Sequence, residues 1–399
     1  MEWKEVTLGE IGTIVGGATP STKNTSFYDG NIPWLTPKDL SVNGNKYIFR
    51  GERNITEAGF KSCSCKMLPK GSVLFSSRAP IGYVAIAAND MCTNQGFKSV
   101  IPNEETDSEF LYYLLKYNKD NIASQGSGTT FAEVSGKTMK DIEVVVPKEK
   151  EDQRRIASIL SSLDRKIELN NKINADLEEM AQAIFKNWFV DFEPFKDGKF
   201  VDSELGMIPE GWKVGTLGDI TKNKSAKVKE RNDVKVLSPV TTGELVLSEE
   251  YFTKQVFSSS IAKYKIVNKG DFAYNPARVN IGSLGRNEFD FDGCVSPVYV
   301  VFSVLDGYEN YFDLFRKTDF FKDSVASLAI GGVRQSLSYD DLSSIEVIIP
   351  SENAVEEFNN LYNQMKKTIK ANKLESSRLS SLRDTLLPRL MSGEIEVPE

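Results

Sequence analysis

Two short segments contain residue types that could support nucleotide or nucleic-acid chemistry. Ser135-Gly136-Lys137-Thr138 resembles the end of a phosphate-binding loop, in which backbone amides, a lysine and a hydroxyl group hold phosphates. That loop also requires a glycine at position 131, where this chain has Phe131. Asn275-Pro276-Ala277-Arg278 lacks the aromatic residue with which an adenine methyltransferase stacks on a flipped base. Both chemistries are therefore excluded for these segments.

The chain has no histidine, and its four cysteines form no recognisable site. The lack of imidazole excludes Ser-His-Asp and Cys-His catalysis and the His-Glu-x-x-His zinc helix. Cys63, Cys65, Cys92 and Cys294 do not have the spacing of a disulfide framework, a CxxC redox motif or a zinc knuckle. We expect small buried thiols, no metal site, no cofactor on this chain and no catalytic residues.

The bulk composition is that of an ordinary globular protein of 399 residues, with 40% hydrophobic and 26% charged residues. No apolar run approaches the ~20 residues of a membrane helix, and the N-terminus lacks a signal-peptide pattern. A cytoplasmic protein is expected. The net charge of −7 argues weakly against nucleic-acid binding, and no region is basic as a whole. Any DNA-binding face must therefore come from local clusters of positive charge.

The elements that position these residues occur twice, about 200 residues apart. Trp3-Lys-Glu-Val-Thr-Leu-Gly-Glu-Ile11 returns as Trp212-Lys-Val-Gly-Thr-Leu-Gly-Asp-Ile220, and Ile142–Pro147 returns as Ile345–Pro350. Between these anchors, Cys92 matches Cys294 and Ile81-Gly82 matches Ile281-Gly282. The period is far longer than that of a solenoid, so the repeat predicts two similar domains with divergent surfaces.

Each copy begins as a mainly-β unit. Short β-like runs alternate with Gly/Pro/Asn/Ser turns in residues 1–147 and again in 210–350. A short helix is expected at Ser108–Tyr117, and its counterpart around Tyr308–Lys322. Residues 191–209 form the linker between the first copy and the second.

Each copy ends in a long amphipathic helix, at 148–190 and 351–393. Nine positions of the first helix match nine of the second at an offset of 202, seven of them apolar in both. Alternating steps of three and four predict a heptad seam that packs on a partner helix. Each seam spans about 36–38 residues, roughly 55 Å at 1.5 Å per residue. Asn170 and Asn372 occupy the same seam position and either fix the register of a helix pair or face solvent.

Two such helices in one chain pair most simply as an antiparallel coiled coil. The predicted fold is therefore α+β: two similar mainly-β domains, separated by the paired helices and related by a pseudo-twofold axis.

The chain resembles the specificity (S) subunits of type I restriction–modification systems over essentially its whole length. The strongest match is the run from Asn174 to Pro194, NADLEEMAQAIFKNWFVDFEP, which is similar to the family's central conserved region. Gly17-x-Thr19-Pro20, Ile32-Pro33-Trp34 and the ending Leu382–Glu394 support it.

The resemblance implies that each domain is a target recognition domain for one half of a split DNA site, and that the coiled coil sets the spacing. It further implies that two methyltransferase (M) subunits dock on this chain, that translocase-nuclease (R) subunits can join, and that the S subunit is not itself an enzyme. S-adenosylmethionine is expected on the methyltransferase and not on this chain.

DNA contacts are then expected from polar loop residues of both domains. In the first domain these are Lys23, Asn24, Lys38, Ser76, Ser77, Arg78, Asn94, Gln95, Ser127, Thr129 and Thr130. In the second domain they are Lys222, Lys224, Lys227, Lys229, Asn275, Arg278, Asn280, Arg334 and Gln335. The basic residues at 222–229 are expected to contact phosphates, and Arg278, Arg334 and Gln335 to contact bases; solvated loops are the alternative for all of them.

The aromatic residues Phe185, Trp188, Phe189 and Phe192 form either a docking surface for the methyltransferase or a cover for the end of the coiled coil against the second domain. An alternative for the whole chain is a coiled-coil scaffold or adaptor that joins two binding modules without a DNA role. The pI of 5.2 favours that alternative slightly.

Overall fold

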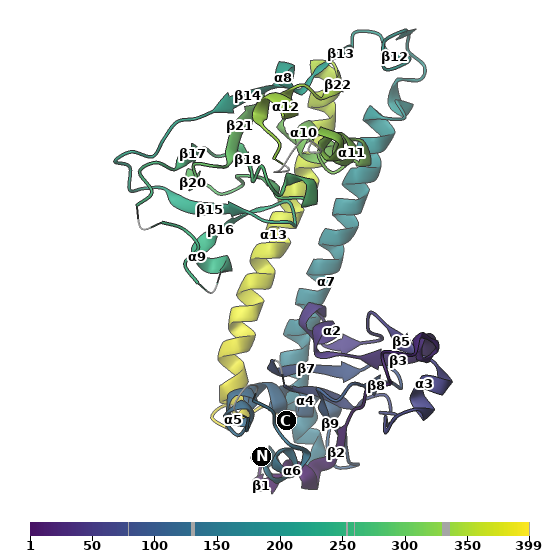
Figure 1. The fold of residues 1–399 in the computed structure, drawn as a ribbon. Helices are drawn as coiled ribbons and strands as arrows, with labels where there is room; N and C mark the ends of the chain where they lie inside the picture. Colours follow the sequence, from purple (N-terminus) through teal and green to yellow (C-terminus); the bar gives the residue numbers. More distant parts are fainter. Residues whose placement is uncertain (79, 129–131, 253, 259, 329–335, 399) are drawn as a thin grey trace. The chain divides into compact units, whose positions relative to one another are not determined.

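A computed structural model describes residues 1–78, 80–128, 132–252, 254–258, 260–328 and 336–398 (Figure 1). The chain divides into two compact units. Unit 1 contains Met1–Asn174 and Lys370–Glu399, and unit 2 contains Ala175–Ile369. Each of the two long helices therefore contributes one segment to each unit.

The strands of unit 1 form three sheets. A five-stranded sheet has the order β2-β9-β6-β7-β4, a three-stranded sheet the order β5-β3-β8, and β1 pairs antiparallel with β10. The strands are β1 Trp3–Thr7, β2 Gly12–Gly16, β3 Tyr28–Leu35, β4 Tyr47–Ile48, β5 Asn54–Ile55, β6 Val73–Ser77, β7 Ile81–Ala87, β8 Cys92–Thr93, β9 Lys98–Pro102 and β10 Glu143–Pro147.

The helices of unit 1 are short, apart from the long helix that follows β10. They are α1 Leu8–Ile11, η1 Thr25–Phe27, α2 Pro37–Val42, α3 Glu57–Lys61, α4 Ser108–Tyr117, α5 Lys119–Ser124 and α6 Gly136–Asp141. The predicted helix at Ser108–Tyr117 is confirmed as α4, whose apolar face is buried in the core of unit 1.

Unit 2 has two four-stranded sheets, β14-β21-β18-β19 and β16-β15-β20-β17, and the pairs β11-β12 and β13-β22. Its strands are β11 Phe200–Val201, β12 Ile208–Pro209, β13 Lys213–Thr216, β14 Thr221–Lys224, β15 Lys235–Pro239, β16 Leu245–Leu247, β17 Lys265–Val267, β18 Phe272–Tyr274, β19 Leu284–Arg286, β20 Gly293–Val295, β21 Val300–Val304 and β22 Glu346–Ile349. Its short helices are η2 Glu193–Phe195, α8 Leu217–Ile220, α9 Ser248–Tyr251, η3 Val279–Ile281, α10 Glu309–Phe315, α11 Asp319–Leu328 and α12 Tyr339–Ser343.

The repeated Thr-Leu-Gly-acid-Ile motif has the same structure in both units. Thr7 is the N-cap of α1 and Thr216 the N-cap of α8, each in a capping box with the acidic residue three positions on. The following leucine, Leu8 or Leu217, is fully buried, and its N–H donates across to the carbonyl of a residue in the second repeated anchor at 2.9 Å. The two sequence anchors are therefore parts of one contact, made once in each unit.

The two long helices are α7 Lys150–Phe189 and α13 Glu352–Met391, each of 40 residues (Figure 1). Within unit 1 their segments run antiparallel, because Asp164 of α7 bonds Arg383 of α13 and the later Asn174 bonds the earlier Asn372. The predicted α+β class with two long helices is confirmed. Forty residues correspond to a helix of about 60 Å.

The seam between the helices is buried where each unit's sheets cover it. Ile156 and Leu160 belong to the core of unit 1, and Phe358 and Tyr362 to the core of unit 2. Met180 and Leu382 are one of the nine matched pairs of the predicted seam, at the offset of 202, but about half of each side chain is exposed. The repeated pattern therefore overestimates how far the helices bury each other.

Candidate nucleic-acid interface

In unit 1, the turn after β8 meets the segment that precedes η1. The Ala18 N–H donates to the carbonyl of Thr93 at 2.9 Å, and the hydroxyl of Thr19 bonds the side chain of Gln95. The side-chain oxygen of Asn94 accepts an amide N–H from within the same turn at 2.8 Å. Asn94 and Gln95, two predicted DNA contacts, therefore lie in a turn whose backbone is held in place.

The segment from Gly17 to Pro20 passes very close to this turn. A β-carbon on Gly17 would lie 2.2 Å from the carbonyl oxygen of Thr93, so no other residue fits. The Trp34 indole and the Tyr28 hydroxyl donate to carbonyls of this segment at 3.0 and 2.7 Å. The Gly-x-Thr-Pro and Ile-Pro-Trp matches thus have one structural role, which is to fasten this segment beside the turn.

Three further predicted contacts of unit 1 are exposed. Lys23 and Asn24 precede η1, and the Asn24 side chain caps that helix by accepting the Ser26 N–H at 3.1 Å. Lys38, in α2, lies 2.7 Å from Glu52, and both side chains are largely exposed. An exposed ion pair contributes little to stability, so Lys38 can exchange Glu52 for a phosphate at little cost.

The prediction that Ser76 and Ser77 lie on an exposed loop is wrong. Both are fully buried at the end of β6, a strand in the interior of the five-stranded sheet. The Ser76 hydroxyl donates to the Pro80 carbonyl and accepts the Tyr83 N–H, both at 2.8 Å. Ser76 therefore shapes the turn between β6 and β7 from inside, and neither serine is exposed to a ligand.

Arg78 lies on that turn and is half-buried beside an acidic residue. Its guanidinium is 3.7 Å from the carboxylate of Glu133, which also pairs with Lys98 at 3.2 Å. Ser127 and Glu133 exchange backbone hydrogen bonds at 3.0 Å, and Arg78 forms a β-bridge with Glu133, so Ser127 and Glu133 lie beside the turn. Two predicted contacts of this loop, Thr129 and Thr130, lie outside the described residues.

The lysines of the basic segment 222–229 in unit 2 lie in two different environments. Lys222, Lys227 and Lys229 are exposed, and Lys229 adopts a left-handed backbone conformation with φ of 55°. Lys224 differs, because its ammonium lies 2.8 Å from the buried carboxylate of Asp271. Burial raises the pKa of Asp271 while Lys224 lowers it, and the pair keeps Lys224 engaged within the fold. Lys224 is therefore a poor phosphate contact, unlike its three neighbours.

The turn that follows β18 carries the predicted base contacts of unit 2. The Asn275 carbonyl accepts the Arg278 N–H at 2.9 Å, and the side chain of Asn275 caps the turn. Arg278 and Asn280 are exposed at its outer edge. The Leu337 N–H donates to the carbonyl of Pro276 at 3.1 Å, so the segment after 335 meets this turn. Arg334 and Gln335 themselves lie outside the described residues.

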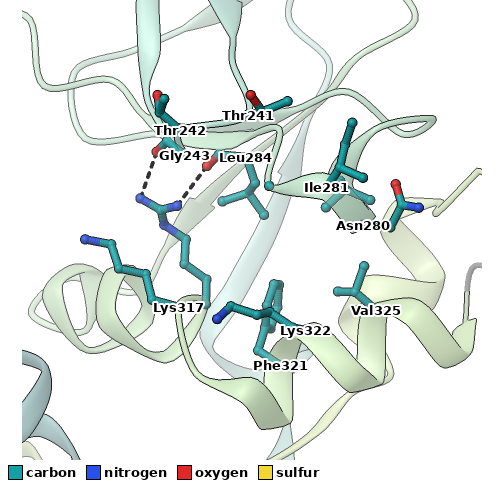
Figure 2. Close-up of a pocket in the computed structure, with 13 residues that line it drawn as sticks. Thr241, Thr242, Gly243, Asn280, Ile281, Leu284, Lys317, Phe321, Lys322 and Val325 are labelled. Atoms are coloured by element: carbon teal, nitrogen blue, oxygen red, sulfur yellow. Dashed lines mark hydrogen bonds between the residues drawn. The ribbon is translucent and has the colours of Figure 1, made fainter. Parts of the chain in front are cut away.

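Beside this turn, unit 2 has a cavity of about 400 Å³. Figure 2 shows Lys317 and Lys322 on one side of it, Thr241 and Thr242 on another and Asn280 at a third. The remaining lining is largely apolar and includes Ile281, Leu284, Phe321 and Val325. The cavity thus combines positive charge, hydroxyl and amide groups, and an apolar wall.

Comparison with known proteins identifies the family. The type I restriction modification DNA specificity domain matches residues 1–179. The MjaIX specificity subunit of Methanocaldococcus jannaschii is 36% identical over all of this chain and 94% of its own length. The chain belongs to the type I restriction enzyme specificity subunits. It is thus the non-catalytic subunit, and the enzyme activity of such systems lies in partner subunits.

Two other relatives span equally large parts of the chain. The HindI specificity subunit of Haemophilus influenzae is 26% identical over 99% of this chain and all of its own length. The crystal structure of the type I S subunit from M. genitalium has the same fold, with a TM-score of 0.60 and 17% identity over 100% of this chain and 97% of that one.

The aromatic run of this specificity subunit lies mainly inside unit 2. Phe185 and Phe189 are buried and pack on Phe358, with ring centroids 6.2 and 5.0 Å apart. Trp188 and Phe192 are partly buried against the same cluster. These four residues therefore cover the helix end within unit 2, and Phe185 and Phe189 offer no surface to a methyltransferase.

The asparagines of the helix seam form a polar layer in unit 1. The Asn170 amide donates to Glu375 at 2.8 Å and to Ser376 at 3.3 Å, and the Asn372 amide donates to Asn174 at 2.9 Å. Position 170 matches 372, and 174 matches 376, at the repeat offset of 202. The Asn170–Ser376 contact therefore corresponds to the Asn372–Asn174 contact, with the donor on α7 in the first and on α13 in the second. Neither Asn170 nor Asn372 is freely solvated.

The cysteines form no site of their own in the described ranges. Cys65, Cys92 and Cys294 are buried as expected, whereas Cys63 is half-buried. A hydrogen bond from Cys92 lowers the pKa of Cys65 to about 7, and burial raises that of Cys294 to about 11. The part of the chain that the structure describes contains no cluster of acidic, cysteine or histidine residues suited to a metal, and none of its helices is long and apolar enough to cross a bilayer.

Sequence reasoning missed the residues that join the predicted loops. Glu133 pairs with both Arg78 and Lys98, and Lys317 and Lys322 line the cavity beside the turn of unit 2 from positions about 40 residues later in the chain. The repeated Ile-Gly pair, at the end of the turn in both units, was the signal that could have located this region.

Proposed function

We propose that this specificity subunit recognises a bipartite DNA site, with the domain of unit 1 contacting one half and the domain of unit 2 the other. The long helices set the spacing between the halves and hold two methyltransferase subunits that methylate adenine; R subunits can join the complex in the cytoplasm. S-adenosylmethionine binds the methyltransferase and not this chain.

One observation carries this proposal: equivalent turns with different chemistry. In unit 1 the turn between β6 and β7 presents Arg78, half-buried beside Glu133. In unit 2 the corresponding turn after β18 presents Arg278 and Asn280, both exposed. The arginine is common to both turns, but Asn280 stands where unit 1 has Pro80, and Arg78 is half-buried whereas Arg278 is exposed. Such differences on a shared framework suit two half-sites of different sequence, since base contacts carry the sequence information.

The layer formed by Asn170 and Asn372 supports the role of the helices. A polar layer in a helix pair fixes one register at some expense of stability. A fixed register gives a fixed separation between domains, and half-site spacing follows from such geometry.

Methylation mapping tests the proposal directly. The chain is expressed together with the methyltransferase subunit of its own system, in a host that lacks both, and methylated adenines are located by sequencing. A bipartite motif with one gap length, present only when this chain is expressed, is expected. Methylation that does not depend on this chain, or a site that is not divided, would contradict it.

The alternative, a scaffold without a DNA role, predicts a different result. A scaffold would hold partner proteins but leave duplex DNA unbound at low salt. Filter binding of the assembled complex to the mapped duplex and to a scrambled duplex separates the two functions.

A further inference from the structure

The Ile-Gly pair that occurs in both halves has a common geometry that base recognition does not explain. Gly82 and Gly282 end the equivalent turns, and both adopt left-handed conformations, with φ of 100° and 95°. Other L-residues are strained there, so the sequence keeps glycine in both copies. At the same offset Arg78 matches Arg278, whereas the two residues between the arginine and the Ile-Gly pair differ.

In unit 1, a lysine lies directly across the glycine. A β-carbon on Gly82 would be 2.5 Å from Cγ of Lys119 and within 3 Å of its Cδ and Cε. Lys119 is the first residue of α5 and is exposed, so its ammonium extends past the turn towards solvent. Among the described residues it has no ion-pair partner. The turn that carries Arg78 thus ends beside an available positive charge.

In unit 2, the same turn borders the cavity shown in Figure 2. A β-carbon on Gly282 would lie 2.6 Å from the carbonyl oxygen of Thr241, so glycine allows the turn to close against the 241–243 turn. Lys317 and Lys322, from α11 and the residues before it, line the opposite side. Lys322 is 3.2 Å from Asp319, an exposed pair that a phosphate can replace.

A buried arginine keeps the cavity in shape. The Arg316 guanidinium donates to the carbonyls of Leu284 and Gly243 at 2.8 and 3.0 Å, and to Asp313 at 2.6 Å. It is nearly inaccessible, so it joins the walls and leaves ligand contact to the two lysines. Such a support fixes the positions of the surrounding hydroxyl and amide groups.

The chemistry of these groups matches a sugar–phosphate backbone. Ammonium and hydroxyl groups bind phosphate oxygens, and the apolar wall with the half-exposed Ile281 suits a deoxyribose ring. We propose that the Ile-Gly turn is a repeated backbone anchor, with Lys119 contacting a phosphate of one half-site and Lys317 and Lys322 contacting phosphates of the other. This inference rests on the proposed DNA-recognition function.

The anchor accounts for what the repeat preserves and what it changes. Phosphates are the same in every DNA sequence, so both domains can use the same turn geometry beside them, although the lysines come from different positions in the two units. Base edges differ, and the side chains just before each Ile-Gly pair differ as well. The common pair positions the duplex, and the divergent residues beside it discriminate sequence.

The salt dependence of binding tests the anchor. The full-length chain, assembled with its methyltransferase, is titrated with the mapped duplex and a scrambled duplex between 50 and 200 mM salt. Lys119→Ala, Lys317→Ala and Lys322→Ala are each compared with the matched control Lys269→Ala, an exposed lysine that pairs with Asp290 and precedes β18 instead of following it. Thermal melting verifies that all variants fold.

Each anchor variant is expected to reduce the slope of log K against log salt by about 0.9, with equal loss on both duplexes and an unchanged methylation motif. The control should leave the slope as it is in the wild type. Unchanged slopes for all three variants, or a changed motif with an unchanged slope, would overturn the anchor.

Two further outcomes distinguish a backbone anchor from a small-anion site and from a failure of the proposed function. If millimolar inorganic phosphate or a nucleotide stabilises the wild type against heat but not the Lys317/Lys322 double variant, while the DNA slopes stay the same, the cavity is a small-anion site and the anchor is refuted. If the wild-type complex does not prefer the mapped duplex, the proposed function fails, whatever the variants do.

Discussion

The buried ion pair between Asp164 and Arg383 offers the sharpest test of how the helices are joined in unit 1. The Asp164 carboxylate accepts hydrogen bonds from Arg383 at 2.6 Å and from the Tyr113 hydroxyl at 2.5 Å. Only 9% of the Asp164 side chain and 19% of the Arg383 side chain are exposed. Burial disfavours the charge of Arg383, but Asp164 and Asp384 hold the pKa of its guanidinium above the usual value.

Arg383→Ala leaves the carboxylate of Asp164 buried with only Tyr113 as a partner. Removal of one member of a buried pair costs about 3–5 kcal/mol. Because Arg383 retains some exposure, we expect the lower end, about 3 kcal/mol, or a fall in Tm of roughly 6–12 °C for a unit of this size. Asp164→Leu combined with Arg383→Leu should recover most of that loss, since apolar replacement of both partners is often neutral.

Hydrogen exchange measured by mass spectrometry assigns the effect to a unit. Peptides from 150–174 should lose protection in Arg383→Ala, whereas peptides from 340–369 should change less. Arg389→Ala is the control, because Arg389 lies on the same helix as Arg383 but forms an exposed pair with Glu394, beyond the helix end, and its loss should cost at most about 1 kcal/mol. If Arg383→Ala proved no more destabilising than Arg389→Ala, the reasoning about burial would be refuted.

Three other perturbations test separate parts of the structure. Arg278→Ala should relax the methylated motif at one half-site only, and methylation sequencing that found both halves unaltered would exclude Arg278 as a base contact. Burial opposes the charge of Asp313, but Arg316 and nearby lysines lower its pKa from 3.8 to about 2. About 2 kcal/mol of stability that is present above pH 4 should therefore be lost as pH falls towards 2. Urea unfolding of Asp313→Asn should lack this pH dependence. Asn170→Leu should change the unfolding free energy by less than about 1 kcal/mol but broaden the gap in the methylated motif, and a single unchanged gap would show that Asn170 does not fix the register.

The long helices and the repeated anchors could be predicted because their signals are local. The heptad steps of α7 and α13 and the capping boxes at Thr7 and Thr216 depend on residues within one or two turns. Ser76 and Ser77 are buried instead of exposed for a reason that is not local in sequence. A polar, turn-like stretch is buried when neighbouring strands cover it, and β7 and β9 come later in the chain.

The aromatic run of α7 was ambiguous for the same reason. Phe185 and Phe189 are equally consistent with a docking surface and with a core until their neighbours are known. The structure places Phe358 and Tyr311 against them, residues more than 120 positions away. No pattern within α7 itself contains that information.

Matched helix positions carry opposite charges in the two halves, and this limits how far the repeat can be interchangeable. Asp164 of α7 corresponds to Lys366 of α13 at the offset of 202. In unit 1, Asp164 accepts from Tyr113 of the domain that packs on it, whereas in unit 2 Lys366 pairs with Glu288. If the domains were exchanged, Glu288 would face an aspartate of like charge, and Tyr113 would lose its carboxylate acceptor. Unfavourable contacts of this kind enforce a choice between similar partners. Each domain is therefore suited to its own helix segment, so the two halves share a framework without being exchangeable.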